Sequence, residues 1–294
     1  MEMKEKKPFF SIIVPTYNRP RQIVSCLEAL SRVNYPRARF EVIVVDDGSR
    51  IPARTVVSSF FDKMNLTVIT QKNAGPSKAR NAGAERAKGD FLAFTDDDCM
   101  PAPDWLLTLS NRFKISPECA VAGPSVNALE ENIYDTASQM LIEYLHGYYN
   151  RDPEQARFIT SNNLSLPAKQ FKAVGGFDTN FSNAGGEDRE FCEHLRHNGC
   201  RIIYAPEVVV HHSHGLTLSS FWRQHFNYGL GAFVFRQKCF QNRRQLVRME
   251  STTFYLKLLS YSHTYNVKHS RSRLTALLFL SQAANALGYF TSRM

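Results

Sequence analysis

Three consecutive carboxylates, Asp96, Asp97 and Asp98, directly follow the apolar run of residues 91–94, and the chain then turns at Pro101. Adjacent carboxylates repel one another unless a positive charge lies among them. Hard divalent cations such as Mg²⁺ and Mn²⁺ prefer oxygen ligands and bridge to substrate phosphates. The segment therefore predicts either a metal–diphosphate site at a strand end or a solvated acidic turn, which short charged runs often form.

The elements that would position these carboxylates alternate between strand and helix patterns. Short apolar runs bounded by Gly, Pro or Asn predict strands, and apolar residues spaced three to four apart predict helices. A β-α-β-α-β-α-β order is typical of an open parallel sheet, in which ligands bind at the carboxyl ends of the strands. The predicted strands are 9–14, 40–45, 66–69 and 91–94, and the predicted helices lie near 23–30, 54–61 and 77–86.

Polar residues follow three of these strands at the shared edge. Thr16 and Tyr17 follow the first strand, Asp46 and Asp47 follow the second, and the three carboxylates follow the fourth. Because the carboxyl ends of parallel strands meet at one edge, these residues predict a single site. No Gly-x-Gly-x-x-Gly follows the first strand and no Gly-x-x-x-x-Gly-Lys-Ser/Thr occurs. Both observations argue against a dinucleotide-binding protein and a phosphate-loop NTPase.

The charge of the chain is unevenly distributed. Its 294 residues fit a large α/β domain with an appendage, and the formal net charge is +9. Residues 216–294 carry 11 Lys and Arg but a single acid, Glu250. Together with the aromatic and aliphatic residues of this segment, that charge suits an anionic membrane surface or a phosphate-bearing acceptor. No nucleic-acid-binding motif accompanies it, so nucleic acid is not expected as a partner.

Cysteine usage and hydropathy predict a cytoplasmic protein. The six cysteines form no Cys-x-x-Cys pair, which is typical of reduced thiols. The charged residues 1–7 precede no apolar segment of the kind found in signal peptides. The apolar stretch 274–290 is interrupted by polar residues and is too short for a confident membrane span. A location at the inner face of the cell membrane is the alternative, through the basic C-terminal region.

Six short motifs occur along the chain. They are Ser11-Ile-Ile-Val-Pro-Thr-Tyr-Asn-Arg19, Val45-Asp-Asp-Gly-Ser49, Asn73-Ala-Gly-Pro-Ser-Lys-Ala-Arg-Asn-Ala-Gly83, Thr95-Asp-Asp-Asp98, Gly175-Gly-Phe-Asp178 and Gly185-Gly-Glu-Asp-Arg-Glu-Phe191. With these motifs in the family's order, the chain resembles the family 2 glycosyltransferases of the GT-A fold over roughly residues 9–215. The resemblance implies an α/β fold, with a Rossmann-like mixed sheet flanked by helices, and a helical basic C-terminal extension at 216–294. The implied GT-A catalytic domain is 1–215, with a nucleotide-sugar half of about 1–100 and an acceptor half of about 101–215.

The resemblance implies a nucleotide-diphosphate sugar as donor and Mn²⁺ or Mg²⁺ as the metal that holds the diphosphate. A metal ion would offset the charge that develops on the leaving group. Asp96 and Asp98 match the family's Asp-x-Asp pair of metal ligands, and Asp97 is expected at the ribose or donor sugar. Tyr17 is expected against the base and Asp47 at the base or ribose. The full expected nucleotide-binding set is Pro15, Thr16, Tyr17, Asn18, Asp46, Asp47, Lys78, Arg80 and Asp97.

Three of these residues also have an ordinary structural interpretation. Tyr17 has the alternative of a packed loop aromatic, because a ring gains energy by packing as well as by stacking on a base. Lys78 and Arg80 are expected to reach the phosphates, with a water-facing position on the helix surface as the alternative.

The Gly-Gly-Glu-Asp motif at 185–188 begins a predicted helix over 189–197. Acidic residues often occupy a first helical turn simply because they complement the helix dipole. The resemblance implies instead that Asp188 is the general base that deprotonates the acceptor hydroxyl, with Glu187 orienting acceptor hydroxyls. One such base opposite the leaving diphosphate gives inversion at the anomeric carbon. The residues expected at the acceptor or donor sugar are Asn162, Asn163 and Gly186.

Three histidines lie at the end of another predicted strand, 208–214. Family members often place a histidine here as a further metal ligand, and His212 matches that position best. His214 shares the face of His212, and His211 points to the opposite face because strand side chains alternate. A zinc centre is the rival interpretation, but the cysteines have no matching spacing.

The sequence as a whole predicts an inverting glycosyltransferase that moves one sugar, with uridine as the expected nucleotide, to a saccharide or lipid-linked acceptor. A nucleotidyltransferase acting on sugar phosphates and a non-catalytic sugar-nucleotide-binding subunit are the alternatives. A processive synthase is disfavoured, because there is no clear membrane span and no Gln-x-x-Arg-Trp signature. Residues 130–155 are expected to form a less regular, aromatic-rich insert. The C-terminal region is expected to contact a membrane, cap the catalytic domain or form a homodimer contact.

Overall fold

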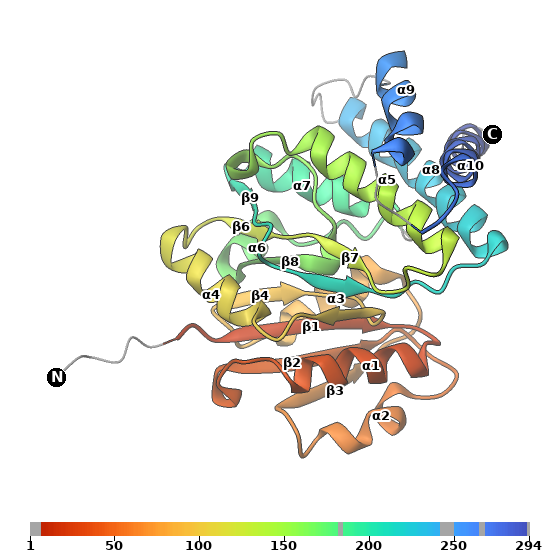
Figure 1. Cartoon of the computed structure of the whole chain (residues 1–294). Coiled ribbons are helices and arrows are strands. Elements are labelled where there is room, and N and C mark those ends of the chain that lie inside the picture. Colours follow the sequence, from red (N-terminus) through yellow and green to blue (C-terminus); the bar gives the residue numbers. More distant parts are fainter. Residues whose placement is uncertain (1–6, 182–184, 242–249, 265–267, 293–294) are drawn as a thin grey trace.

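The computed structural model describes residues 7–181, 185–241, 250–264 and 268–292. A central sheet lies between layers of helices, and the C-terminal helices gather at the end of the molecule away from β3 (Figure 1). The sheet has the strand order β3-β2-β1-β4-β8-β6-β9. Its strands are β1 (Phe10–Thr16), β2 (Phe40–Asp46), β3 (Leu66–Thr70), β4 (Phe91–Phe94), β6 (Ala120–Ala122), β8 (Leu164–Pro167) and β9 (Ile202–Tyr204).

The first four strands form the predicted parallel half of the sheet. β1 lies between β2 and β4 and is parallel to both, with Thr16 opposite Asp46 and Phe10 opposite Phe91. β2 is buried along its whole length, as expected for a parallel strand covered on both faces. β8 runs antiparallel to β4 and β6, which makes the sheet mixed. The predicted α/β fold with a mixed sheet is thus confirmed.

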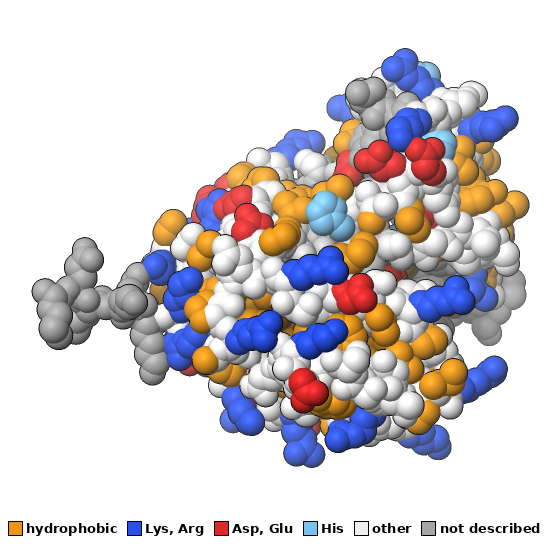
Figure 2. Space-filling view, turned by 60° about the horizontal axis from the view of Figure 1, so that its bottom comes forward, with side chains coloured by type: hydrophobic (Ala, Val, Ile, Leu, Met, Phe, Trp, Pro, Cys, Tyr) orange, Lys and Arg blue, Asp and Glu red, His pale blue; other side chains and the backbone are white. Residues whose placement is uncertain are grey.

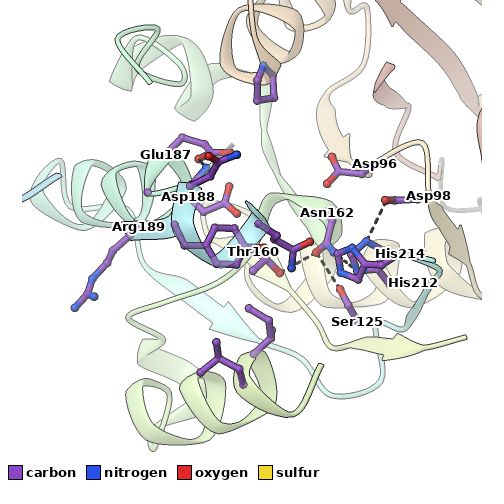
Figure 3. Close-up of a pocket in the computed structure, with 18 of the residues that line it drawn as sticks. Asp96, Asp98, Ser125, Thr160, Asn162, Glu187, Asp188, Arg189, His212 and His214 are labelled. Carbon is purple, nitrogen blue, oxygen red and sulfur yellow. Dashed lines mark hydrogen bonds and ion pairs between the residues drawn. The ribbon is translucent and has the colours of Figure 1, made fainter. Parts of the chain in front are cut away.

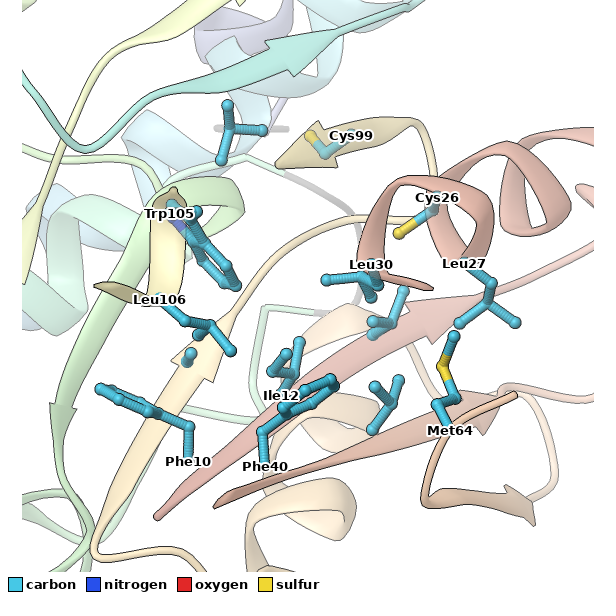
Figure 4. Packing of buried hydrophobic residues seen from close by; sticks show 14 of the residues in the cluster. Phe10, Ile12, Cys26, Leu27, Leu30, Phe40, Met64, Cys99, Trp105 and Leu106 are labelled. Carbon is cyan, nitrogen blue, oxygen red and sulfur yellow. The ribbon is translucent and has the colours of Figure 1, made fainter. Parts of the chain in front are cut away.

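Alternate residues of β1 serve the two faces of the sheet. Ile12 belongs to one core, which Figure 4 shows together with Phe10, Leu27 and Trp105. Ile13 belongs to a second core on the opposite face. The helices of the first face are α1 (Pro20–Ser31) and α4 (Trp105–Ile115), and those of the second are α3 (Pro76–Arg86), α6 (Ala168–Val174) and α7 (Glu187–His197). Burial on both faces makes the sheet a rigid base for its carboxyl edge.

A second, three-stranded sheet lies beside that edge and connects distant parts of the chain. β10 (Val210–His212) pairs antiparallel with β5 (Cys99–Pro101) and parallel with β7 (Ser125–Asn127). In this register His212 lies opposite Cys99, so the histidine segment is brought next to Asp98. The strand 208–214 predicted from the sequence is therefore shorter than expected.

The C-terminal region is helical, as predicted, and packs against a helix of the preceding part of the chain. These helices share an apolar cluster that includes Met140, Phe221, Leu258 and Leu278. None of the helices in the described ranges is long and apolar enough to cross a membrane. The helices are α5 (Ile133–Tyr149), α8 (Leu218–Gln241), α9 (Thr252–Ser260) and α10 (Arg271–Thr291).

The expectation of an irregular insert at 130–155 was wrong. α5 is a regular helix of 17 residues, and the Asn132 side chain accepts hydrogen bonds from the backbone amides of Tyr134 and Asp135 at its start. Many α5 residues are aromatic or β-branched, so its local helix propensity is weak. The helix is stabilised by contacts with α8, α9 and α10, which no local pattern could reveal.

Two predicted helices also differ in detail. The helix expected near 54–61 is divided into α2 (Ala53–Val56) and a 3₁₀ turn, Ser58–Phe60. α7 begins at Glu187, two residues before the predicted start, so both acidic residues of the motif belong to its first turn.

Basic residues are not confined to the C-terminal region on the molecular surface. On the face shown in Figure 2, Lys and Arg side chains are spread over both the sheet-containing part and the C-terminal helices.

Candidate active site

A single cavity of about 740 Å³ opens at the carboxyl ends of β1, β2 and β4 and continues between α5, α7 and α8. Most of the residues predicted for the site lie in its wall. They are Pro15, Thr16, Tyr17, Asp47, Arg80, Asp96, Asp97, Asp98, Asn162, Gly186, Glu187, Asp188, His212 and His214. The structure therefore brings the strand-end, helix-start and histidine motifs together in one site.

Four predicted residues lie outside the cavity wall. Asp46 is fully buried, and its carboxylate accepts hydrogen bonds from the backbone amides of Ser49 and Ala53. Asn18 lies in a neighbouring hollow, where its side chain accepts from the amide of Arg50. Lys78 is in α3 but not among the lining residues.

Asn163 is the fourth of these residues and has a packing role. Its side-chain oxygen accepts from the indole of Trp105 at 2.9 Å. Its nitrogen donates to the carbonyls of Pro124 and Val208. All of its partners belong to the interior behind the site, so Asn163 is not placed to touch a substrate.

Asp47 lines the cavity, but its carboxylate organises a loop. The oxygens accept from Gln71 Nε2 at 2.6 Å, from Asn73 Nδ2 at 3.1 Å, and from the backbone amides of Ala74 and Gly75 at 2.9 Å each. This ring of donors fixes the loop that leads into α3. Asp47 could make its expected contact with the base or ribose only in addition to these four hydrogen bonds.

The middle and last of the three carboxylates share one cation. Arg19 Nη1 lies 3.0 Å from Asp97 Oδ1 and 2.8 Å from Asp98 Oδ2. Asp97 also accepts from the Thr16 hydroxyl at 2.7 Å. Burial outweighs these partners and raises the pKa of Asp97 to about 7. Burial would also raise the pKa of Asp98, but the charge and hydrogen bond of His212, with Arg19, hold it well below its usual range.

Asp98, His212 and His214 form a candidate cation site in which one ligand atom of each lies within 4.8 Å of the others. One carboxylate and two imidazoles suit Mn²⁺ and other first-row ions. Burial lowers the pKa of His214 to about 3, so its ring stays neutral and able to ligate. His211 is exposed and lies outside the cluster. Asp96 does not belong to this cluster either.

Asn162 holds the ring of His212 from behind the candidate cation site (Figure 3). Asn162 Nδ2 lies 3.3 Å from His212 Nδ1, and His212 Nε2 lies 3.0 Å from Asp98 Oδ1. A histidine that ligates through Nε2 keeps its proton on Nδ1. The Asn162 amide serves this tautomer only when turned over, with its nitrogen then donating to the Ser125 and Thr160 hydroxyls that otherwise donate to its oxygen. In that orientation the residues around His212 fit a metal ligand at its Nε2.

Arg80 connects the donor-side carboxylates to the acidic start of α7. Its side chain is buried, and Nη2 donates to Asp96 Oδ1 at 2.8 Å while Nη1 lies 3.7 Å from Glu187 Oε1. Burial opposes the charge, but Asp96, Asp188 and Glu187 raise the pKa of Arg80, so it stays a cation. Its Nε and Nη1 atoms have no hydrogen-bond partner among the described residues. Arg80 lines the cavity, so its charge can act beside a bound diphosphate.

The two acidic residues at the start of α7 differ in their surroundings. Glu187 Oε2 accepts from the backbone amide of Gly185 at 2.6 Å, and burial together with the charge of Asp188 raises the pKa of Glu187 to about 7. Asp188 Oδ1 is buried and has no hydrogen-bond partner among the described residues. Burial raises the pKa of Asp188 against the opposing effects of Arg80 and of hydrogen bonds with Ser161. Asp188 lines the cavity, and its Oδ1 is a buried acceptor atom with no partner among the described residues.

Sequence reasoning missed several residues of this site. Arg19 belongs to the loop after β1, and a basic residue following a polar strand end is a signal that could have found it. Ser125 and Thr160 donate to Asn162 Oδ1 at 2.9 and 2.8 Å, and no local pattern marks either of them. The C-terminal region also contributes to the cavity wall through α8, including Gln224 and Tyr228. The predicted boundary between residues 215 and 216 therefore cuts through the wall of the site.

Comparison with known proteins agrees with this geometry. The sequence model of glycosyl transferase family 2 matches residues 11–172, more than half of the chain, and a model described as the N-terminal domain of galactosyltransferase matches residues 148–215. The chain belongs to glycosyl transferase family 2. This membership confirms the family resemblance drawn from the motifs.

Three similar proteins illustrate the relationship. The validoxylamine A glucosyltransferase of Streptomyces hygroscopicus subsp. jinggangensis is 29% identical over 68% of this chain and 54% of its own length. A mannosyltransferase from Pyrobaculum calidifontis, solved with GDP-Man and Mn²⁺, has a TM-score of 0.62 and 19% identity over 96% of this chain and 76% of its own. S. aureus TarS 1-349 in complex with UDP-GlcNAc has a TM-score of 0.56 and 19% identity, over 97% of this chain and 90% of its own.

The two solved structures show that the fold is shared. The chain spans about half or less of the length of the curated relatives it matches, for example 54% of the glucosyltransferase.

Proposed function

We propose that this chain carries the catalytic site of an inverting, metal-dependent glycosyltransferase. It moves one sugar from a nucleoside-diphosphate sugar to a saccharide or lipid-linked acceptor. The observation that carries the proposal is Asp188, which lines the same cavity as the Asp98–His212–His214 cluster and whose buried Oδ1 has no hydrogen-bond partner among the described residues. Figure 3 shows Asp188 on one side of the site and this cluster on the other, with Asn162 between them.

Family membership and structural neighbours support the donor and the metal. The Pyrobaculum neighbour was solved with GDP-Man and Mn²⁺, and the S. aureus neighbour with UDP-GlcNAc. Mn²⁺ or Mg²⁺ is the proposed metal, and the two imidazoles of the cluster favour Mn²⁺, because Mg²⁺ prefers oxygen ligands. Uridine is the proposed nucleotide.

The chain's own residues would carry the transfer in one step. Asp188 accepts the proton of the acceptor hydroxyl, whose oxygen bonds to the anomeric carbon as the bond from that carbon to the diphosphate breaks on the opposite side. Attack from the opposite side inverts the configuration. Arg80 supplies positive charge beside the leaving diphosphate. A divalent ion held by Asp98, His212 and His214 supplies further positive charge there.

The test is the variant Asp188→Asn, compared with Glu193→Gln on the same helix, whose carboxylate pairs with Arg196 at the surface. Asp188→Asn should retain sugar-nucleotide binding and lose transfer to a panel of saccharide acceptors by about 10²–10⁴-fold. Glu193→Gln should behave as wild type. Transfer by Asp188→Asn at a near wild-type rate would show that the base is another residue. Release of pyrophosphate from UTP and a sugar phosphate would instead identify a nucleotidyltransferase.

We further propose a cytoplasmic location with contact to the inner face of the cell membrane. The support is the outer face of α10, where Phe279, Leu287 and Phe290 are 52–63% exposed and the exposed Arg271 and Arg273 lie at the start of the helix. Apolar residues beside basic ones are typical of helices that lie on anionic membranes.

Sedimentation with phosphatidylglycerol vesicles tests this contact. The double variant Phe279→Ser, Phe290→Ser should bind less than wild type, and Phe240→Ser, at an even more exposed site on α8, should bind as wild type. If the double variant bound the vesicles as well as wild type, this face of α10 would not be the membrane contact. Loss of self-association in the double variant would assign it to a homodimer.

A further inference from the structure

The cavity continues past the catalytic carboxylates into a lane between α5 and α8. One face of α5 lines it, with Gln139, Ile142, Leu145 and Tyr149 spaced three or four residues apart. This spacing puts all four side chains on the same side of the helix. Ten residues of helix extend about 15 Å, so this wall is elongated.

The opposite wall is one face of α8. Gln224, Tyr228, Ala232 and Phe235 follow one another at the same helical spacing. Phe254 of α9 also lines the cavity. The two helix faces therefore line an elongated part of the cavity.

The chemistry of the lane changes along its length. At the end beside the cation site, Gln139 donates to the backbone carbonyl of Ser125, and Gln224 Nε2 donates to Ser138 Oγ at 2.8 Å. Ser125 in turn contacts Asn162, the residue that holds His212. The near end is therefore lined by amides and hydroxyls, which suit sugar hydroxyls.

The far end is apolar. Leu145, Phe158, Phe235, Phe254 and Tyr255 line it. The partly buried Leu145 and Tyr255 pack against the apolar cluster of the C-terminal helices. Contact between this apolar lining and apolar groups of a ligand would make the free energy of binding more favourable, because both surfaces are removed from water.

The charges at the far end balance one another. Arg189, the residue after Asp188, donates to the Tyr149 hydroxyl at 3.1 Å and lies 4.9 Å from the Tyr149 ring and 5.4 Å from the Phe235 ring. The Tyr149 hydroxyl in turn donates to Glu250 at 2.5 Å. A cation and an anion joined through one hydroxyl leave no excess charge for a phosphate. Asp188 and the residues of the lane line the same cavity.

We propose that the acceptor is a glycoside with an extended alkyl or prenyl chain, and that this chain occupies the lane between α5 and α8. The inference rests on the proposed function, because the acceptor's sugar hydroxyl must reach Asp188. It narrows the proposed saccharide or lipid-linked acceptor to an amphipathic glycoside. The elongated shape favours a chain over a compact aromatic group, and the balanced charges favour an uncharged one.

Titration calorimetry with short probes below their micelle concentration tests the proposal, with UDP and Mn²⁺ present. Octyl, 4-nitrophenyl and methyl β-glycosides of glucose, galactose and N-acetylglucosamine are compared pairwise. The octyl glycoside of the accepted sugar should bind at least tenfold more tightly than its methyl counterpart. Ala232→Trp, which fills the lane, should abolish the difference, and Ala286→Trp on the exposed face of α10 should keep it.

The milder variant Leu145→Asn covers the case in which Ala232→Trp fails to fold, and it should also reduce the octyl preference. Equal affinity of octyl and methyl glycosides, or an octyl preference that survives both lane variants, would overturn the proposal. A preference for the 4-nitrophenyl glycoside alone would replace the chain with an aromatic group. Binding of UDP with Mn²⁺ in the same titrations distinguishes failure of the acceptor proposal from failure of the proposed function. If UDP with Mn²⁺ did not bind, the proposed function itself would be contradicted.

Discussion

Gly231 of α8 lies directly against the backbone of Gly185, just before the catalytic helix α7. A Cβ atom added at Gly231 would lie 1.7 Å from the Gly185 carbonyl oxygen, a distance at which atoms overlap. Gly186, in the left-handed region at φ +88°, meets the same point of α8 from the other side. The C-terminal region is therefore in backbone contact with the loop that positions Glu187 and Asp188.

This contact predicts that Gly231→Ala displaces the base. The loop must move by about an ångström to admit a methyl group, and misplacement of that size can cost about 10² in rate. kcat should fall about 10–100-fold, while the KM for the sugar nucleotide changes little. Steady-state kinetics with varied donor at saturating acceptor measures both.

Gly229→Ala is the matched control, since Gly229 faces α10 and its Cβ would lie 2.0 Å from the Asn285 carbonyl oxygen. Both variants should lower the melting temperature, but only Gly231→Ala should lower kcat where both are folded. Equal losses of kcat would mean that the helices act only through overall stability.

The pH dependence of transfer should reflect the raised pKa values at the start of α7. Burial raises the pKa of Glu187 to about 7 and also raises that of Asp188. Because a base must be deprotonated to act, kcat/KM should decline at a higher pH than an exposed carboxylate would give, since an exposed carboxylate loses its charge only near pH 4. A pH–rate profile from 5 to 9 measures this.

Binding of UDP with Mn²⁺ over the same pH range separates the base from the metal ligands. If UDP binding is constant while kcat/KM declines, the decline is caused by protonation of the carboxylates at the start of α7. A profile that stays flat to pH 5 would contradict the raised pKa values.

The raised pKa of Glu187 should also affect folding stability, which should fall as pH rises, whereas the transfer rate should increase. A carboxyl group whose folded pKa is raised binds protons more tightly in the folded state, so stability falls as pH rises from about 4.5 through 7. Glu187→Gln removes this penalty and should increase the free energy of unfolding at pH 8 by roughly 1–3 kcal/mol relative to its effect at pH 5. Urea unfolding at the two pH values measures it. A Gln variant equally or less stable at pH 8 would show that Arg80 fully compensates the charge.

The candidate cation site predicts metal-dependent nucleotide binding. His212→Ala and His214→Ala should each weaken the binding of UDP with Mn²⁺ by at least about tenfold, because each removes one of three ligands. His211→Ala, on the exposed face of the same segment, should bind as wild type. Calorimetry with UDP, GDP, dTDP and CDP, repeated with chelator, measures this and identifies the nucleotide. If the nucleotide bound equally well in the presence of chelator, the assignment of a cation to this cluster would be wrong.

The sequence by itself determined the parallel half of the sheet and the edge at which the site lies. The apolar runs that became β1, β2 and β4 are continuous because both faces of a parallel sheet are buried, and this local signal survives without knowledge of the fold. Polar residues at their ends, Thr16, Asp47 and Asp96 to Asp98, follow from the same rule. The Gly-Gly-Glu-Asp motif likewise predicted a helix start, because acidic side chains in a first helical turn complement the helix dipole and the preceding glycines can adopt the backbone conformations of a turn.

Only the tertiary structure decided how these residues divide their roles. Asp96 pairs with Arg80, whereas Asp98 joins His212, more than a hundred residues away. Asn162 and Asn163 are adjacent in the sequence, yet one supports His212 and the other the packing of Trp105. α5 and α8 form the far wall of the cavity through contacts that neither segment encodes alone. Such roles depend on distances between distant segments, and those distances are set by packing of the whole chain, which no local pattern of residue types records.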